Sequence, residues 1–307
     1  MNTRLFPWFL AVLLFLSGGV SGVETPPRPE PDETDVAYGD DPLQRFDVWK
    51  AAKGTDGLPA PILIHFHGGG FVKGDKASFD PTIPLAAGIG CVSADYRFVN
   101  GEDRLVEAPF ADAARVVQVV RERAAEWGLD GGRIALAGET AGGVLALWVA
   151  YHDDFGDPQS DDRTARRSTR VRAVVALDAP TNLLPDWILE HVGGRPEVHP
   201  AFALMFGQKM DEPLAPETQR LIRSVSPWHQ VSRDDPPTFL AYTGALATEV
   251  LPAETDPLVV VHHANFGEAL TERLREKGIE CSFEPEASPE TVPEVLDFLR
   301  HQFGMVE

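Results

Sequence analysis

The chain has 307 residues, of which 43% are apolar, and its 47 acidic and 27 basic side chains give a formal net charge of −20. That length and apolar content suit one large domain or two ordinary ones and exclude general disorder. The acidic balance argues against nucleic acid as a partner, because a body of this charge repels phosphate backbones.

The first 22 residues predict a secretory signal peptide. Arg4 precedes an apolar run over residues 5–16, and small residues follow as far as Gly22. The run is too short for a comfortable membrane span. We therefore expect export to the periplasm or the extracellular space, with no stable membrane span after cleavage; an uncleaved anchor is the alternative. Residues 23–35 are rich in Pro and charge and predict a flexible leader.

Beyond the leader, strand-like apolar runs alternate with helical patterns. Strands are expected over residues 61–66, 89–94, 133–137, 171–177, 238–242 and 281–283, and helices over 108–127, 141–151, 265–277 and 293–303. This alternation predicts an α/β fold with a parallel sheet and helices on both faces. No second domain boundary is visible, so residues 36–307 are expected to form one domain.

A long insertion interrupts the alternation at about residues 180–236. It holds short helical stretches at residues 187–191 and 216–225, and it is too long for a bare loop. We expect a partial lid over the strand ends, with a purely structural excursion as the alternative.

The two cysteines and the motif inventory argue against a disulfide framework or a metal site. Cys91 and Cys281 lie in apolar, strand-like surroundings and are expected to be buried apolar residues. Neither CxxC nor HExxH occurs in the chain. We expect no metal and no cofactor, and the sequence carries no signal for an oligomeric state.

Two glycine motifs carry the chemical signal. His67-Gly68-Gly69-Gly70 directly follows a predicted strand, and successive glycines let backbone N–H groups approach a ligand, as an oxyanion hole requires. The second motif, Gly138-Glu139-Thr140-Ala141-Gly142, lies between a strand and a helix and resembles the G-x-S-x-G nucleophile elbow.

Together, in this order and context, the motifs resemble those of the hormone-sensitive-lipase-like carboxylesterases of the α/β-hydrolase fold. The resemblance covers roughly residues 46–303. It implies an eight-stranded, mostly parallel sheet, a Ser-Asp-His triad, and hydrolysis of a small-molecule ester without a cofactor. By position, it assigns the oxyanion donors to Gly69, Gly70 and Ala141 and an orienting role in the glycine loop to His67.

Every triad position departs from that pattern. Thr140 stands in place of the nucleophilic Ser, and a β-branched residue suits the positive φ of an elbow poorly. Ala247 falls where the acid is expected, with Asp256, Glu249 and Asp178 as substitutes that are more ordinary as loop carboxylates.

The base is also missing from its usual place, because residues 284–290 contain no His. The adjacent pair His262 and His263 opens the helix after the seventh strand, where one of the two can stand in as base; packing or capping at the helix start is the alternative. His301 lies inside the final predicted helix and suits surface packing.

Two functional hypotheses follow. The first is an exported carboxylesterase-like hydrolase with an altered triad of Thr140, His262 or His263, and Asp256 or Glu249. The second is a non-catalytic pseudohydrolase that binds a small molecule or a protein partner in the retained pocket. Loss of triad members usually lowers a hydrolase's rate by several orders of magnitude, so weak or absent activity is expected.

Overall fold

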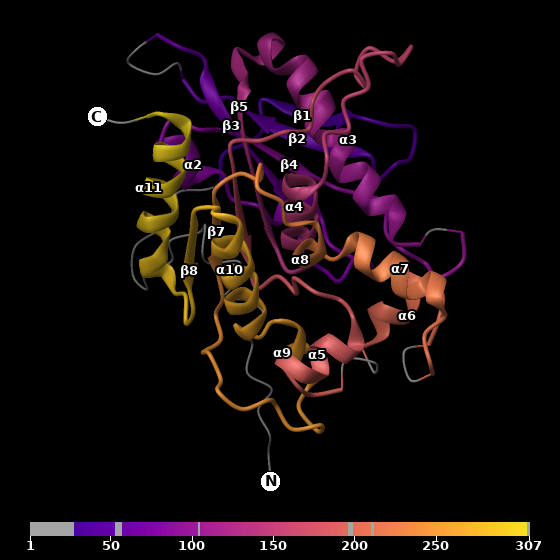
Figure 1. Ribbon diagram of the computed structural model, residues 1–307. Coiled ribbons are helices and arrows are strands. Elements are labelled where there is room, and N and C mark those ends of the chain that lie inside the picture. The colour runs from indigo at the N-terminus through magenta and orange to yellow at the C-terminus, as the bar shows by residue number, and fades with distance from the viewer. Residues whose placement is uncertain (1–27, 53–56, 104, 196–198, 210–211, 306–307) are drawn as a thin grey trace.

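The computed structural model describes residues 28–52, 57–103, 105–195, 199–209 and 212–305 (Figure 1). These residues form one eight-stranded sheet with the strand order β1-β2-β4-β3-β5-β6-β7-β8. The strands are β1 (Glu33–Ala37), β2 (Arg45–Trp49), β3 (Ala60–Phe66), β4 (Gly90–Ala94), β5 (Leu129–Glu139), β6 (Ala173–Leu177), β7 (Thr238–Ala241) and β8 (Cys281–Glu284).

Most of the sheet is parallel. The strands from β4 through β8 pair in parallel, whereas β2 pairs antiparallel with both β1 and β4. The eight-stranded, mostly parallel sheet that the resemblance implied is therefore confirmed. Parallel strands need helical crossovers, which cover both faces and make the central strands apolar on each side; all seven residues of β3 are buried.

Helices cover both faces of this sheet. The larger core packs α3 (Glu107–Arg123), α4 (Ala141–Tyr151), α8 (Pro227–Gln230) and α10 (Asn265–Lys277) against one face, and α11 (Val292–Phe303) packs against the other. Alternation along β3 shows the two faces directly, since Ile62 and Ile64 join the larger core and Leu63 joins the smaller one. The short helix α2 (Thr82–Ala86) lies between β3 and β4.

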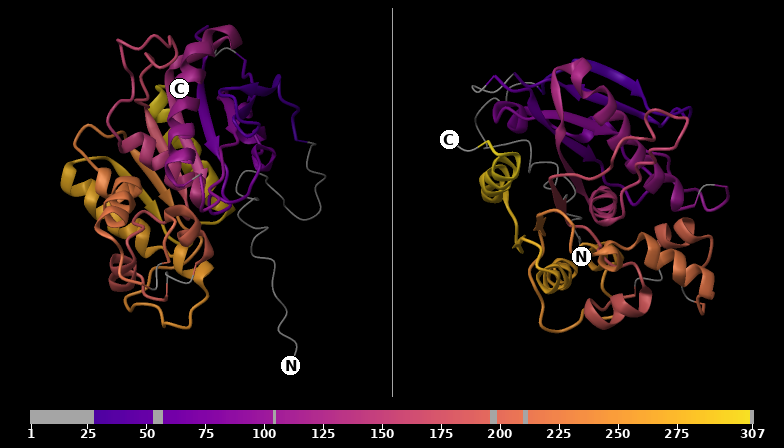
Figure 2. Two further views of the ribbon diagram at one scale, coloured as in Figure 1. Left: turned by 90° about the vertical axis from the view of Figure 1, so that its right-hand side faces the viewer. Right: turned by 45° about the horizontal axis from the view of Figure 1, so that its top comes forward.

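The insertion between β6 and β7 is mainly helical. It contains α5 (Pro185–His191), α6 (Pro200–Phe206), α7 (Pro216–Val225) and α8, and each of these helices has Pro within its first two positions. The helix α9 (Pro257–Val261) follows β7. In both views of Figure 2 the salmon-to-orange insertion lies on the side of the molecule away from the indigo N-terminal strands.

The structure differs from the sequence-based expectation at the N-terminal leader. Residues 33–35 belong to β1, and the indole N–H of Trp49 donates to the Pro29 carbonyl at 2.9 Å. Neither β1 nor β2 was expected from pattern alone, because β1 is short and largely exposed at the sheet edge. The expected signal peptide, residues 1–22, lies outside the described residues.

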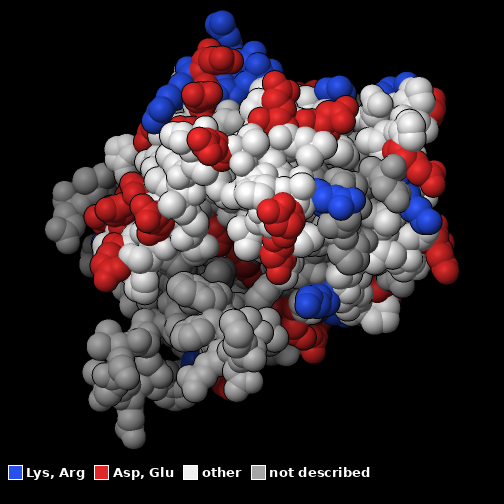
Figure 3. All heavy atoms as spheres, turned by 90° about the horizontal axis from the view of Figure 1, so that it is seen from below, with Lys and Arg blue, Asp and Glu red and all other residues white. Residues whose placement is uncertain are grey.

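Two further features of the described residues are the apolar character of the helices and the distribution of surface charge. In the part of the chain that the structure describes, no helix has both the length and the apolar character that a membrane crossing needs. Figure 3 shows acidic side chains scattered among neutral ones, together with basic side chains that gather at the top of this face and occur singly elsewhere.

Candidate active site

Polar residues gather where the central strands end. Thr140 directly follows β5, His67 directly follows β3, and Asp178 directly follows β6. Because these strands are parallel neighbours, their carboxyl ends lie at one edge of the sheet, which is where open α/β sheets bind ligands.

Thr140 occupies a strained strand-to-helix turn. Its backbone has φ 50° and ψ −114°, and its N–H donates to the Leu177 carbonyl at 2.8 Å. The turn is sharp because Gly142 passes close to β3: a Cβ on Gly142 would lie 1.9 Å from the Phe66 carbonyl oxygen. Thr140 therefore has the positive φ of an elbow nucleophile, a conformation that a β-branched residue rarely adopts.

Backbone N–H groups line the space beside Thr140. A Cβ built on Gly68 would lie 2.7 Å from Thr140 Oγ1, so the glycine loop passes directly over the hydroxyl. Gly69 has φ 112°, which favours glycine. Within the described residues, no acceptor takes the N–H of Gly69, Gly70 or Ala141. We call these three N–H groups, which the resemblance assigns as oxyanion donors, the oxyanion cradle; N–H groups without an acceptor are what an oxygen that carries negative charge needs.

Glu139 fixes the glycine loop from one side. Its Oε1 accepts the Gly68 N–H at 2.8 Å, and its Oε2 lies 2.7 Å from His65 Nε2. Burial alone would raise the pKa of Glu139, but the charge and hydrogen bond of His65 and the Gly68 N–H hold it below its usual value. Sequence reasoning missed His65; the available signal was a polar residue inside a wholly buried strand.

His67 fixes the same loop from the other side. Its Nδ1 lies 2.7 Å from the Gly68 carbonyl oxygen and therefore donates to it. The ring stacks on Tyr96 at 4.4 Å, and the Tyr96 hydroxyl donates to the His67 carbonyl at 2.8 Å. The two sides of the Gly68 peptide are thus held by separate side chains.

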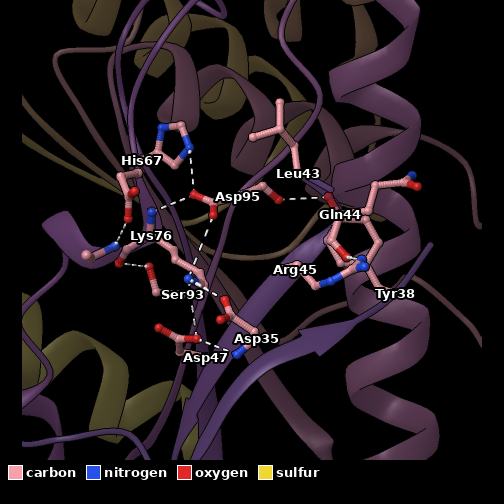
Figure 4. Close-up of polar contacts among 12 residues, drawn as sticks. Asp35, Tyr38, Leu43, Gln44, Arg45, Asp47, His67, Lys76, Ser93 and Asp95 are labelled. Atoms are coloured by element: carbon pink, nitrogen blue, oxygen red, sulfur yellow. Dashed lines mark hydrogen bonds and ion pairs between the residues drawn. The ribbon is translucent and has the colours of Figure 1, made fainter. Parts of the chain in front are cut away.

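A partly buried lysine, Lys76, lies near His67. Figure 4 shows Lys76 among the carboxylates of Asp35, Asp47 and Asp95, with Asp95 also 3.5 Å from His67 Nε2. Burial alone would lower the pKa of Lys76, but these three carboxylates raise it above its usual value. Lys76 N also donates to Asp95 at 2.6 Å, which fixes the carboxylate beside the imidazole.

Ala247 occupies the position where the acid is expected, and Asp256, one of the substitutes, makes a different hydrogen bond. Ala247 is held by Asn265, whose Oδ1 accepts the Ala247 N–H at 3.1 Å. Asp256 caps α9 by accepting the Leu258 N–H at 2.9 Å. Buried Asp178 accepts both the N–H and the hydroxyl of Thr243, at 2.8 and 3.0 Å, yet burial raises its pKa to about 6.

The two candidate bases lie at the junction of α9 and α10. His262 ends α9, and burial together with neighbouring His199 lowers its pKa to about 4. His263 Nδ1 accepts the Asn265 N–H at 3.2 Å, and burial lowers its pKa. Among the described residues, no hydrogen bond joins either imidazole to Thr140.

The site therefore combines the oxyanion cradle with an elbow hydroxyl that makes no hydrogen bond to a base among the described residues. Within the described ranges, no group of three or more His, Cys, Asp or Glu side chains is placed to hold a metal ion. The arrangement can bind an electron-rich oxygen, whereas proton removal from Thr140 has no hydrogen-bonded partner in this structure.

Sequence comparisons find relatives that are named esterases. Esterase LipI of Mycobacterium tuberculosis is 38% identical over 107 residues, which are 34% of this chain and 33% of that protein. Esterase LipC of the same organism is 36% identical over 146 residues, or 46% of this chain and 35% of its own length. The matched segments thus span about a third of the length of these two relatives.

Solved structures share the fold. An acetyl ester-xyloside bifunctional hydrolase from Caldicellulosiruptor lactoaceticus superimposes with a TM-score of 0.65 at 20% identity, covering 86% of this chain and 90% of its own. The butyrate-bound esterase Est2 of Thermogutta terrifontis gives 0.64 at 20% identity and covers 91% and 96% of the two chains.

Sheet order, elbow and glycine loop together define an α/β-hydrolase of the esterase kind, as the resemblance to the hormone-sensitive-lipase-like carboxylesterases implied. The chain belongs to the BD-FAE family, whose sequence profile matches residues 46–258.

Proposed function

We propose that this protein binds an ester or a related carbonyl compound in the oxyanion cradle and hydrolyses it slowly or not at all. The observation that carries the proposal is the contrast at the elbow. The Gly68 peptide is held on both sides, whereas the Thr140 hydroxyl has no imidazole partner among the described residues. Binding of a ligand oxygen uses the held glycine loop, whereas turnover needs an imidazole partner for the Thr140 hydroxyl.

Relatives indicate the kind of ligand. LipI and LipC are named esterases, and Est2 was solved with butyrate and with propionate bound. A short carboxylate presents the same oxygen to the cradle as a cleaved acyl group does. Butyrate is therefore a suitable binding probe, and p-nitrophenyl butyrate is the matching ester.

The test measures turnover and binding separately. Hydrolysis of p-nitrophenyl butyrate is followed for wild type, Thr140→Ser and Thr140→Ala, and butyrate binding is followed by ligand-observed NMR for wild type and Thr140→Leu. We expect wild type to match Thr140→Ala in hydrolysis. We also expect butyrate to bind wild type but not Thr140→Leu, whose larger side chain fills the space under Gly68. Circular dichroism checks that each variant is folded.

Two results overturn the proposal. Hydrolysis by wild type that disappears in Thr140→Ala would show that an altered triad works, and His262→Ala, His263→Ala and Asp256→Ala would then identify the base and the acid. Absence of both hydrolysis and butyrate binding would contradict binding of an ester or carbonyl compound. Binding of a protein partner would then be the remaining hypothesis.

We also propose that residues 1–22 direct export. The support is their sequence pattern, a basic start followed by a short apolar run and small residues. Fractionation of cells that express the full chain, followed by N-terminal sequencing, should find a shortened protein outside the cytoplasm. An intact N-terminus on membrane-bound protein would indicate an uncleaved anchor instead.

A further inference from the structure

Exposed large apolar side chains gather in two segments of the chain. Among the described residues, six such side chains are exposed, and five of them lie within residues 185–194 and 245–262: Leu189, Leu246, Val250, Leu258 and Val259. Single exposed apolar residues are ordinary, whereas a contiguous group of them marks a surface that another molecule covers. We call these five side chains the apolar patch.

The two segments are held side by side, at the end of the molecule where Figure 1 labels α5 and α9. Leu251 N donates to the Val192 carbonyl at 2.8 Å, and Gly194 N donates to the Leu251 carbonyl at 2.9 Å. The helix α9 packs against the same place, because a Cβ on Gly194 would lie 2.2 Å from Val260 Cγ2. Four members of the apolar patch lie within three residues of these contacts.

The fifth member, Leu246, is brought to the same place by Asn265. The Asn265 Nδ2 donates to the His191 carbonyl at 3.0 Å and to the Ala247 carbonyl at 3.1 Å. Leu246 directly precedes Ala247, so it lies beside the end of α5. The apolar patch is therefore one surface built from α5, the loop after β7 and α9.

The helix α9 is apolar on every side. Val260 and Val261 are buried in the larger core, whereas Leu258 and Val259 are 40% and 53% exposed. A helix that is apolar all round is normally covered all round. In the part of the chain that the structure describes, the outer side of α9 has no such cover.

The charge of the two segments indicates what covers the apolar patch. Both segments are acidic, since neither contains Lys or Arg, although Arg195 follows the first. They carry five exposed carboxylates: Asp186, Glu190, Glu249, Glu254 and Asp256. A second copy of this chain would bring the same carboxylates together, which is unfavourable. Helices that lie on membranes place Lys or Arg beside their apolar residues, which is the opposite of this pattern.

A basic amphipathic helix complements both features of this surface. Its apolar side covers exposed apolar side chains, and its Lys and Arg side chains lie opposite carboxylates, which favours encounter and fixes orientation. We propose that the apolar patch docks a helix of this kind from a partner protein. The inference concerns a surface outside the oxyanion cradle and does not rest on the proposed ester binding.

The test uses a labelled synthetic helical peptide of leucine and lysine, with all leucines on one face, and follows its binding to the full chain by fluorescence anisotropy. We expect wild type to bind this peptide. Val250→Asn combined with Val259→Gln should weaken the binding by about tenfold, because both changes remove apolar surface that the peptide covers. The matched control is Leu58→Gln, since Leu58 is 52% exposed but lies outside the apolar patch.

A second pair of variants separates local from overall charge. Glu190→Gln combined with Glu254→Gln should weaken peptide binding and reduce its dependence on salt. Glu102→Gln combined with Asp161→Asn removes the same charge from exposed sites elsewhere and should have a smaller effect. Circular dichroism checks that each variant is folded, and all the changed side chains are exposed.

Three results would overturn the proposal. The first is peptide binding that the valine variant weakens no more than Leu58→Gln does. The second is equal binding of a peptide with the same composition in scrambled order, which has no apolar face. The third is another occupant: a dimer in sedimentation velocity, or binding to phosphatidylcholine vesicles in preference to the peptide, that the valine variant abolishes. Butyrate binding at Thr140 is measured separately and does not depend on these outcomes.

Discussion

Among the described residues, Thr140 is one of five non-glycine residues with a positive φ, the others being Asp35, Phe71, Asp178 and Glu286. Positive φ at a residue other than glycine costs about 1–3 kcal/mol, and β-branching makes that conformation still less favourable. The rest of the turn enforces it, because Gly138 and Gly142 are packed backbone against backbone. The strain remains although the hydroxyl has no base to activate it, so the turn is determined by packing and not by chemistry.

Replacing Thr140 by glycine should therefore stabilise the fold. Glycine removes the strain but adds freedom to the unfolded chain, so we expect the free energy of unfolding to rise by about 1 kcal/mol. Urea denaturation measures the change. The matched control is Thr255→Gly, where φ is not positive and a loss of about 0.5–1 kcal/mol is expected. Equal losses in both variants would show that Thr140 is not strained.

Asp178 should make stability depend on pH. Burial raises its pKa from an ordinary value of 3.8 to about 6, so the charged form is disfavoured in the folded protein. Its contribution is fully present below pH 3.8 and is lost as pH rises through 6. Asp178→Asn lacks that loss and should be more stable than wild type by about 2–3 kcal/mol at pH 8, but not at pH 4.

Urea unfolding of wild type and Asp178→Asn across this pH range checks the prediction, with Asp161→Asn on an exposed loop as the control. A stability difference that does not change with pH would mean that Asp178 ionises normally and that the amide acts only through its hydrogen bonds to Thr243.

At the scale of single residues, the sequence motifs predicted the two glycine segments but not the side chains that hold them in place. Elbow and glycine loop were visible because successive glycines and a strand-to-helix switch are local patterns. His65, Lys76 and Asp95 were not assigned, because their roles depend on β3, β4 and the 3-10 turn at Lys76–Ser78 lying side by side. Contacts between residues distant in sequence leave no short-range signal.

At the scale of elements, Asn265 joins three segments at the start of α10. Its Nδ2 donates to the carbonyls of His191 and Ala247, and its Oδ1 accepts the Ala247 N–H. These bonds attach the loop after β7 to α5 and α10. The loop occupies the place where the family's acid is expected, and the Asn265 amide is one of the groups that hold it.

Asn265→Ala should release that loop. We expect a loss of about 2 kcal/mol in the free energy of unfolding, because three partly buried backbone groups lose their partner. Amide exchange over residues 244–256 should become faster while the central strands stay protected. Gln302→Ala is the control, since its amide makes a single exposed hydrogen bond to Glu280. Unchanged exchange in the loop would show that other contacts hold it.

The central strands and their helices were predicted better from the sequence than the strands at the N-terminal edge of the sheet. Central strands and their helices carry strong apolar periodicity, and α7 has the expected bounds of Pro216–Val225. The first strand was missed because an exposed antiparallel edge carries a weak pattern of polar and apolar residues. The second strand is buried from Phe46 to Trp49, and it was missed because Asp47 interrupts its apolar run. Their presence came only from the family resemblance.

At the scale of the whole molecule, the net charge and the apolar core are separate properties. The two cores that sandwich the sheet are apolar, whereas the net charge of −20 belongs to the surface. A surface of this sign repels polyanions over a distance set by ionic strength.

The protein should therefore show no affinity for double-stranded DNA, even at low salt. Electrophoretic mobility shift at low and at physiological salt measures this directly. Binding that weakens steeply with salt would reveal a local basic surface that the overall balance hides.

The turns after β7 and β8 are joined through their main chains. Glu286 N donates to the Gly244 carbonyl at 3.1 Å, and Ala287 N donates to the Tyr242 carbonyl at 2.7 Å. Main-chain bonds do not depend on side-chain identity, and residues 245, 246, 248 and 249 are exposed. The backbone of these two turns is therefore held in place whether or not they carry acidic or imidazole side chains. Such side chains can be lost or introduced without altering the backbone that would direct them towards the elbow.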